Sequence, residues 1–251
     1  MKAISDYIQE WEINAKTTRY KNHVRESIEC IKECKKIGVL FSISWSGGKD
    51  STAVAHLVKS IWPEVPIISQ FDDCDWADKE PYMTQVAKKF GWEIIKAVPD
   101  FSVWEMARQY KIGVEHVCAG SHDMTKLAFF DPLNKKQKEH GAGGIFMGLR
   151  AEESRMREMN YYKRGMLYQL KSGEWRCNPI VRLLVDDVFS YLITNDVGIN
   201  PCYLKNRFFP PQRIRLSWAF PTPSGVSKGE MRHIKYYYPQ HYQRLQELNI
   251  Q

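Results

Sequence analysis

The residues with the clearest chemical potential form one short string, Ser46-Gly47-Gly48-Lys49-Asp50-Ser51-Thr52. The two glycines let the backbone turn tightly and bring its N–H groups close to a ligand. Ser46, Ser51 and Thr52 add hydroxyl donors, and Lys49 adds a positive charge. Such a set suits the oxygens of a pyrophosphate or polyphosphate. Asp50 would repel a bare phosphate, which indicates a Mg²⁺ ion bridging its carboxylate to the phosphate oxygens.

This string differs from the two best-known phosphate-binding patterns. A Walker A loop needs a glycine five positions before Gly48 and a Ser or Thr after Lys49, and the chain has neither. A G-x-G-x-x-G turn is also absent from the string. The alternative is an ordinary strand-to-helix turn with Asp50 as the helix cap, but the full string in its setting favours nucleotide binding.

The segments on either side of the string are those that an anion site needs. Residues 39–45 are short, apolar and rich in β formers, and they lie between Gly38 and Gly47, which predicts a buried strand. A helix is predicted to begin at Asp50 or Ser51. Its unpaired N–H groups and the positive end of its dipole then point toward the turn.

Further strands and helices alternate along the chain. Strands are predicted at 66–71, 93–98 and 145–147, with a helix at 81–90, and an amphipathic helix precedes Gly38. This order predicts an α/β fold with a parallel, five-stranded, Rossmann-like sheet covered by helices on both faces. Ligands of such sheets bind beyond the carboxyl ends of the strands, so the loops near residues 45, 71 and 148 matter most.

The remaining stretches divide the chain into three predicted parts: an N-terminal helical segment at 1–37, a nucleotide-binding domain at 38–203 and a basic, aromatic extension at 204–251. A weakly patterned stretch at 115–144 is expected to hold a helix and a mobile loop. From Tyr203 to Lys235 there are seven Lys or Arg and a single acid. Four prolines predict an irregular arm there, followed by a short helix near 240–248.

The basic arm has two interpretations. Its aromatic residues could stack on the bases of a nucleic acid while Arg and Lys contact phosphates. Alternatively, the aromatics close the core and the arginines are solvated. The aromatic residues concerned are Phe208, Phe209, Trp218, Phe220 and Tyr236 to Tyr238.

Composition limits the class of protein. The 251 residues are 43% apolar and 26% charged, with a net charge of +7, as expected of a globular enzyme with a phosphate-bearing ligand. No apolar run approaches the roughly 20 residues that cross a bilayer, and the N-terminus has no signal pattern, so a cytoplasmic protein is expected. The six cysteines form no C-x-x-C pair, so neither zinc nor an iron–sulfur cluster is expected, and Cys30 and Cys34 are interpreted as small buried residues.

The string at 46–52 resembles the PP-loop of the N-type ATP pyrophosphatases, and further blocks resemble the phosphoadenosine phosphosulfate reductase branch of that superfamily. One block is the Asp72 turn after the second strand. The others are a G-x-R-x-x-E-S-x-x-R pattern at 148–157, Pro179-Ile180, Asp187-Val188-Phe189 and Asn200-Pro201-Cys202-Tyr203. These blocks keep the family's order over about two thirds of the chain.

The resemblance implies an adenine nucleotide, ATP or a related one, across the carboxyl ends of the strands. Ser44 and Asp72 match positions near adenine and ribose. The turn with Gly148 and Arg150 matches a segment that closes over the nucleotide. The phosphate cradle matches Ser46, Gly48, Lys49, Asp50 and Ser51.

Three arginines in the second block have the planar forks that bind phosphate or sulfate oxygens, namely Arg150, Arg155 and Arg157. The alternative is a surface ion-pair network with Glu152, Glu153 and Glu158. Together with Lys49 and Asp50, we expect Arg150 and Arg157 to be catalytic.

One family pattern is missing from the chain. Reductases of this branch end in a Glu-Cys-Gly-x-His motif whose Cys attacks the sulfonucleotide, and no such string occurs here. The sequence therefore favours an ATP pyrophosphatase that adenylates a substrate for sulfur transfer, such as DNA phosphorothioate modification with a cysteine desulfurase as sulfur donor. The alternatives are a sulfonucleotide reductase or sulfate adenylyltransferase-like enzyme acting on a small molecule, and a non-catalytic nucleotide binder; an oligomer is compatible with each.

Overall fold

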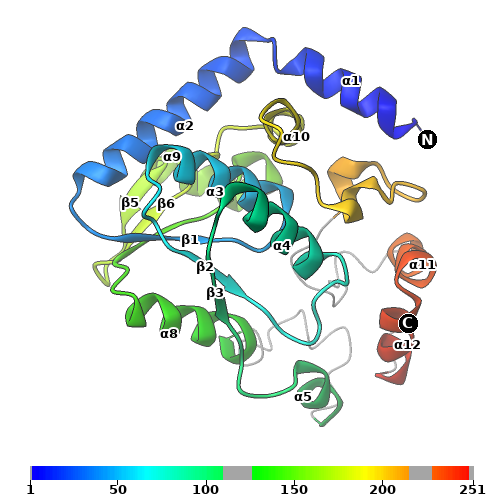
Figure 1. Ribbon diagram of the computed structural model, residues 1–251. Coiled ribbons are helices and arrows are strands. Elements are labelled where there is room, and N and C mark those ends of the chain that lie inside the picture. The colour runs from blue at the N-terminus through cyan, green and yellow to red at the C-terminus, as the bar shows by residue number, and fades with distance from the viewer. Residues whose placement is uncertain (1, 110–125, 215–227, 249–251) are drawn as a thin grey trace.

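The computed structural model describes residues 2–109, 126–214 and 228–248. At its centre lies a six-stranded sheet with the order β3-β2-β1-β4-β6-β5 (Figure 1). Each neighbouring pair is parallel except β5 and β6, which are antiparallel. The strands are β1 (Phe41–Ser44), β2 (Ile67–Gln70), β3 (Ile94–Ala97), β4 (Gly144–Phe146), β5 (Leu167–Gln169) and β6 (Trp175–Cys177).

The four strands predicted by residue range are confirmed, but the expected count of five strands is one too low. Five strands are parallel, and β5 adds a sixth that forms a hairpin with β6. Both hairpin strands have only three residues, which is too short for an alternating pattern to stand out. Gly173, with a φ of 91°, lies in the tight connection between them.

Helices cover both faces of the sheet. In Figure 1, α2, α3, α4 and α10 lie on one side and α8 lies on the other, where it contacts β2 and β3. The helices are α1 (Ile4–Asn14), α2 (Thr18–Lys36), α3 (Lys49–Ile61), α4 (Lys79–Phe90), α5 (Val103–Gln109), α8 (Asp131–Glu139), α9 (Arg155–Arg164), α10 (Val185–Thr194), α11 (Lys228–Tyr237) and α12 (Pro239–Glu247).

The strand order creates a reversal between β1 and β4. From β1 the chain builds outward through β2 to β3, and it then crosses the other face through α8 and returns to β4 on the free side of β1. The loops after β1 and β4 therefore leave the same edge of the sheet side by side. Ligands of open α/β sheets bind at such a switch point.

The N-terminal helices pack against the body of the protein. Helix α1 contacts α10, and α2 contacts α3. Ile31 and Cys34 of α2 belong to the main core cluster, and Val24 and Ile28 pack against it, as expected of an amphipathic helix before Gly38. Buried Asp187, from the Asp-Val-aromatic block, accepts two hydrogen bonds from Arg19 and thereby ties α10 to α2. The predicted boundary at residue 37 stays a prediction.

The C-terminal stretch is more regular than predicted. Helix α12 agrees with the short helix expected near 240–248, but α11 occupies part of the expected irregular arm. The prolines that suggested irregularity all precede residue 228, so nothing in 228–237 prevents a helix. Ile234, Tyr238 and Leu245 pack with Trp104 of α5 in a separate core cluster.

The weakly patterned stretch at 115–144 is described only in part. Residues 115–125 of the expected mobile loop lie outside the described residues, and 131–139 form α8. Among the described residues, every helix is too short or too polar to cross a bilayer.

Candidate functional site

The glycine turn lies where the sequence placed it, between β1 and α3. Gly47 adopts a φ of 73°, in the left-handed region that favours glycine, and an added Cβ would lie 3.0 Å from Met83. The turn closes through Ser51, whose Oγ lies 3.2 Å from the Ser46 backbone nitrogen and 3.0 Å from Ser46 Oγ. The result is a compact loop at the N-terminus of a 13-residue helix.

The loop after β4 presses directly on this turn. A Cβ added to Gly148 would lie 2.7 Å from the backbone nitrogen of Ser51 and 2.8 Å from the carbonyl carbon of Asp50. Both neighbours are backbone atoms that a side chain could not push aside. Only glycine at this position allows the two loops to meet, so the first residue of the G-x-R pattern has a steric reason to be glycine.

A series of ion pairs joins the glycine turn after β1 to the loop after β4. Asp50 lies between Lys49, whose Nζ is 2.8 Å from Oδ2, and Arg150, whose Nε is 2.6 Å from Oδ1. The side chains of Lys49 and Arg150 are each only 3% exposed. Both cations are therefore held in fixed positions at the edge of the sheet, beside the N-terminus of α3.

The chain of charges continues outward from Arg150. Its guanidinium pairs with Glu152 and Glu153, and Glu153 in turn pairs with Arg157. The arginine forks expected to face a ligand are thus bonded to carboxylates, as in the alternative interpretation. Arg150 nevertheless differs from a surface pair because it is buried, whereas the Arg157 side chain is 40% exposed.

The charges around Asp50 also set its protonation state. Burial by itself raises the pKa of this carboxyl, but Lys49 and Arg150 together hold its pKa below the usual value of 3.8. Asp50 is therefore ionised at neutral pH. Three positive and three negative side chains balance in this cluster, which consists of Lys49, Asp50, Arg150, Glu152, Glu153 and Arg157.

Two residues that the sequence analysis quoted without a role brace the turn. The hydroxyl of Tyr203 accepts a hydrogen bond of 3.1 Å from the Lys49 N–H, and its ring centroid lies 5.4 Å from Lys49 Nζ. Asn200 donates its side-chain N–H to the carbonyl oxygen of Gly47 at 3.2 Å. The Asn-Pro-x-Tyr block was visible in the sequence, but its contact with the turn required the fold.

Thr52, which was expected among the hydroxyl donors of the string, faces the core. Its side chain is fully buried, and its hydroxyl accepts a hydrogen bond of 2.9 Å from the indole N–H of Trp45. Its backbone N–H bonds to Gly48 within the helix. Because Thr52 is the fourth residue of α3, its side chain points back into the core, so it supports the turn from inside instead of facing a ligand.

Ser44 and Asp72 end neighbouring strands. Ser44 is half-buried at the end of β1. Asp72 follows β2, and its carboxylate accepts hydrogen bonds from the Gln70 side chain at 2.7 Å and from the Cys74 N–H at 2.8 Å. Both therefore lie along the edge predicted for a nucleotide, with Asp72 one strand away from the glycine turn.

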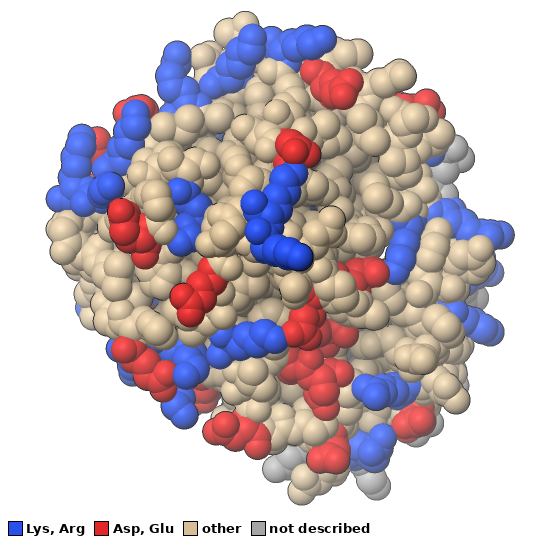
Figure 2. Space-filling view, in the orientation of Figure 1, with Lys and Arg blue, Asp and Glu red and all other residues tan. Residues whose placement is uncertain are grey.

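An acidic cavity opens beside Asp72. Its volume is ≈ 620 Å³, and Asp73, Asp75 and Glu80 line it together with Asp72. Figure 2 shows acidic side chains gathered near the middle of the visible face, in the region of α4 and α5. Lys79, buried at the start of α4, pairs with Asp75 at 2.7 Å and was missed by the sequence analysis. This side of the edge repels phosphates and suits hydroxyl groups.

Magnesium on Asp50 does not fit the observed arrangement. Both carboxylate oxygens of Asp50 already accept from cations, and the sets of potential metal ligands among the described residues do not include it. A Mg²⁺ ion there would face Lys49 and Arg150 at close range. Asp50 therefore holds these two cations in place.

The thiols form one cluster that the sequence did not indicate. The sulfur atoms of Cys30, Cys34 and Cys177 lie within 4.8 Å of one another, on α2 and β6. They are free thiols, and burial raises the pKa of Cys177. Cys74 is also buried, and burial raises the pKa of its thiol, so it is a poor nucleophile. Cys118, the sixth cysteine of the chain, lies outside the described residues.

The basic extension supplies evidence for its core-closing interpretation. Lys205 pairs with Asp78 at 2.6 Å and lies 4.0 Å from the ring centroid of Tyr238, which is buried. Arg207 stacks on exposed Tyr236, so one cation–aromatic pair remains accessible. Trp218 and Phe220 lie outside the described residues.

A known protein family matches most of this chain. The family model of the phosphoadenosine phosphosulfate reductase domain matches residues 41–243. A phosphoadenosine 5'-phosphosulfate reductase of Vibrio parahaemolyticus is 24% identical over 165 residues, which are 65% of this chain and 61% of that protein. The chain thus spans about three fifths of the length of this curated relative.

Solved structures share the fold at low identity. A phosphoadenylyl-sulfate reductase of Candida auris has a TM-score of 0.54 at 15% identity, covering 70% of this chain and 82% of that one. An FMN adenylyltransferase of Candida glabrata has 0.53 at 11%, covering 79% and 65%. A U34-tRNA thiolase of Methanococcus maripaludis, solved with its 4Fe-4S cluster, has 0.50 at 12%, covering 91% and 79%.

Proposed function

The chain belongs to the phosphoadenosine phosphosulfate reductase domain family, and from this premise we propose that it is an ATP-dependent adenylyl-transferring enzyme that releases pyrophosphate. The observation that carries the proposal is the meeting of two loops at the switch point of the sheet. There Gly148 packs on the backbone of Asp50 and Ser51, and Lys49 and Arg150 are held beside the N-terminus of α3. Such a site suits a triphosphate.

In this proposal the nucleotide lies along the edge of the sheet from β2 to β4. Asp72 and the neighbouring acidic cavity take the ribose and adenine side, because carboxylates accept hydrogen bonds from hydroxyls. The turn at 46–51 takes the phosphates. Phosphate oxygens then approach Lys49 and Arg150 while Asp50 and Glu153 continue to hold these cations, so the positive charges are in place before the ligand arrives.

The proposed reaction is an in-line displacement. An oxygen of the acceptor attacks the α-phosphorus, and the bond from that phosphorus to the oxygen bridging to the β-phosphorus breaks. Pyrophosphate leaves with the electron pair, and an ionised phosphodiester oxygen of the acceptor has no proton to lose. The chain's own groups position the phosphates and stabilise charge on them, with Lys49 and the turn N–H groups as the principal contributors.

The acceptor is proposed to be a nucleic acid that then receives sulfur. A sulfur nucleophile from a partner, such as the persulfide of a cysteine desulfurase, would attack the acceptor phosphorus that bears the adenylated oxygen, and AMP would leave with that oxygen. A thiol would then reduce the S–S bond to the donor cysteine and leave the sulfur on the phosphorus. The likeness in fold to a U34-tRNA thiolase supports this class of chemistry, and DNA phosphorothioate formation is the form that we propose.

A small-molecule reaction is the second candidate, because the curated relative is named a phosphoadenosine phosphosulfate reductase. Three of the described thiols do not favour it, since burial raises the pKa of Cys74, Cys177 and Cys202. The thiol of Cys30 differs, because its hydrogen bond with Cys177 lowers its pKa to about 4. Turnover of a sulfonucleotide with thioredoxin would establish this alternative and overturn the nucleic-acid one.

The test uses ATP labelled at the α- or the γ-phosphate, with Mg²⁺ and with DNA, tRNA or sulfate as separate acceptors. The proposal expects labelled pyrophosphate from the γ-label and transfer of the α-label to DNA. Orthophosphate as the only product would overturn it. Lys49→Gln should lose the activity, and Lys32→Gln, which removes an exposed lysine of α2 paired with Glu29, serves as the matched control.

A further inference from the structure

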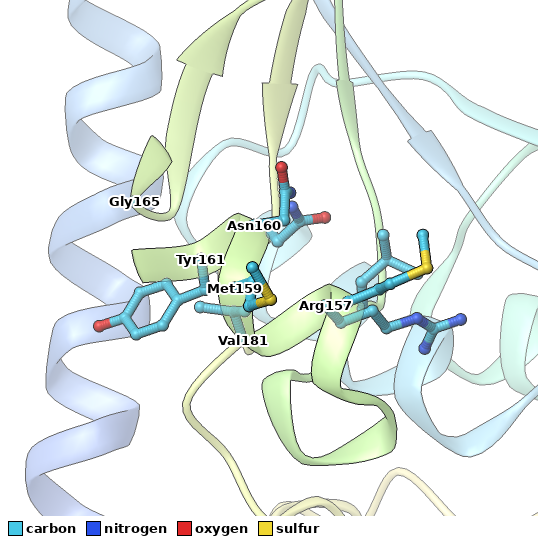
Figure 3. Close-up of a pocket in the computed structure, with 9 residues that line it drawn as sticks. Arg157, Met159, Asn160, Tyr161, Gly165 and Val181 are labelled. Atoms are coloured by element: carbon cyan, nitrogen blue, oxygen red, sulfur yellow. The ribbon is translucent and has the colours of Figure 1, made fainter. Parts of the chain in front are cut away.

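A second cavity lies next to the Gly148–Arg150 turn, on the side of β4 and β6. Its volume of ≈ 430 Å³ falls within the roughly 300–1,000 Å³ of small-molecule sites. Figure 3 shows Tyr161 and Arg157 pointing to opposite sides with Asn160 between them. The lining consists of Leu149 from the turn, Met156, Arg157, Met159, Asn160 and Tyr161 from α9, and Gly165, Asn178 and Val181 from the β5–β6 side.

Asn178 gives this cavity an unsatisfied polar group. It follows β6, is 3% exposed and lines the cavity. Its Oδ1 is buried and has no hydrogen-bond partner among the described residues. Buried acceptors of this kind are nearly always satisfied in folded proteins, so a ligand with an N–H or O–H donor is the expected partner.

Helix α9 is unusually exposed to solvent for a helix of a folded protein. None of its ten residues is buried, and Met156, Met159 and Tyr162 are 83%, 61% and 76% exposed. Large exposed apolar side chains gathered on one element mark a binding surface. The same helix carries Arg155, Arg157, Lys163 and Arg164 against a single acid, Glu158, which favours an anionic partner.

We propose that this cavity receives one unstacked base of a nucleic-acid strand whose phosphates lie along the basic residues of α9. The apolar and aromatic lining packs on the flat ring, and the carboxamides of Asn178 and Asn160 bind its polar edge. Arg157, at the rim, lies next to the backbone. The inference rests on the proposed function, because it names the acceptor's class and its binding site.

The cavity adjoins the phosphate loop through covalent neighbours. Leu149, which lines it, lies between Gly148 and Arg150, and both of these contact Asp50 or Ser51. Arg157 is joined to Arg150 through Glu153. A strand held at α9 would therefore place its backbone and base beside the phosphates bound at the turn.

The test uses a short single strand of DNA or of RNA that carries 2-aminopurine at one position and a fluorescein label at one end. Anisotropy measures strand binding, and 2-aminopurine emission reports when the base leaves its stack. The wild-type protein should bind the strand, with affinity falling as salt rises, and should change the 2-aminopurine signal without ATP.

Neighbouring tyrosines provide matched variants. Tyr161→Ala removes a cavity wall and should weaken binding by about fivefold or more and abolish the 2-aminopurine response, on the scale of one lost stacking contact. Tyr162→Ala removes an exposed ring of the same helix that does not line the cavity, and should keep the response. Met159→Glu, at an exposed position, should mimic Tyr161→Ala without affecting folding.

Two outcomes would overturn the inference, and a third would separate it from the proposed function. One is an unchanged 2-aminopurine response in both Tyr161→Ala and Met159→Glu. Another is failure of the wild-type protein to bind either strand while it still binds ATP, which would leave the proposed adenylyl transfer intact and point to a protein partner on α9. In the third outcome, the wild-type protein binds the strand but not ATP, and the cavity variants lose the 2-aminopurine response. This result would support the base site and refute the proposed function.

Discussion

The phosphate loop and the cavity beside α9 lie next to each other at the same edge of the sheet, yet they are built in opposite ways. In the loop, Lys49 and Arg150 are each 3% exposed and are paired with carboxylates. In the cavity, the Asn178 Oδ1 lacks a partner among the described residues, and α9 buries none of its side chains.

This difference shows two ways of preparing for a ligand. Charged groups that must act in a reaction are fixed in advance, because fixed charges need not reorganise when the transition state forms. Groups that recognise an acceptor stay unsatisfied until it binds, and their free energy is recovered in the complex. Variants of the first region should therefore affect chemistry and stability together, and variants of the second should affect only acceptor binding.

Lys49→Gln should produce the largest effect. Glutamine keeps a hydrogen bond to Asp50 but removes the positive charge, so pyrophosphate release should fall by roughly 100- to 1,000-fold, as for loss of one transition-state contact. Pyrophosphate release at saturating ATP measures the loss, with circular dichroism to check folding. Binding of the labelled strand should not change. Activity close to that of the wild type would contradict the catalytic role of the phosphate loop, because Lys49 would then have only a structural role.

Asp50→Asn should lower the free energy of unfolding at pH 7 by about 3 kcal/mol, because it leaves two buried cations without their shared carboxylate. The pKa of Asp50 is held below 3.8, so its stabilisation is fully present above that pH and is lost as the pH falls through the lowered pKa. The difference between wild type and variant should stay constant from pH 7 to pH 5 and shrink below pH 3.8. Denaturant titrations across that range measure it, and shrinkage already at pH 6 would contradict the assignment.

Gly148→Ala should destabilise the protein by about 2 kcal/mol and also weaken ATP binding, because its Cβ would overlap the backbone of the turn. Gly173→Ala is the matched control. Its position is open but has a φ of 91°, so we expect a loss of about 1 kcal/mol and unchanged ATP binding. Thermal unfolding and calorimetric titration separate the two effects. Equal ATP affinity in both variants would show that contact between the loops is not needed.

Tyr203→Phe should have the smallest effect, about 1 kcal/mol in stability, with ATP binding weakened by several-fold, since the Lys49 N–H loses its acceptor. Tyr237→Phe removes a hydroxyl that accepts a hydrogen bond of 3.3 Å from the Arg207 N–H, in the C-terminal extension. It should cost similar stability without changing ATP affinity. If the two variants affect ATP binding equally, Tyr203 does not act through the turn.

Local patterns in the chain were enough for the elements of the site. The order of β1, the glycine turn and α3 followed from a short apolar run, two glycines and a polar helix start, because these depend on residues close in sequence. The strands β2, β3 and β4 followed in the same way. The hairpin of β5 and β6 and helix α11 were missed, because three-residue strands and a helix after a proline-rich stretch have weak local signals.

The partners of each charged group depend on contacts between distant residues. The sequence contained Asp50, Arg150 and Tyr203 but could not say that they meet, because 100 residues separate the first two and the strand order brings their loops together. For the same reason Thr52 was expected at the ligand, although the pitch of α3 turns it into the core. The sequence by itself therefore determined the residue types and the order of the elements. The tertiary structure decided the ion pairs, the burial of each group and the unsatisfied Asn178. The reason is that the free energy of a charge or a hydrogen bond depends on the groups that surround it.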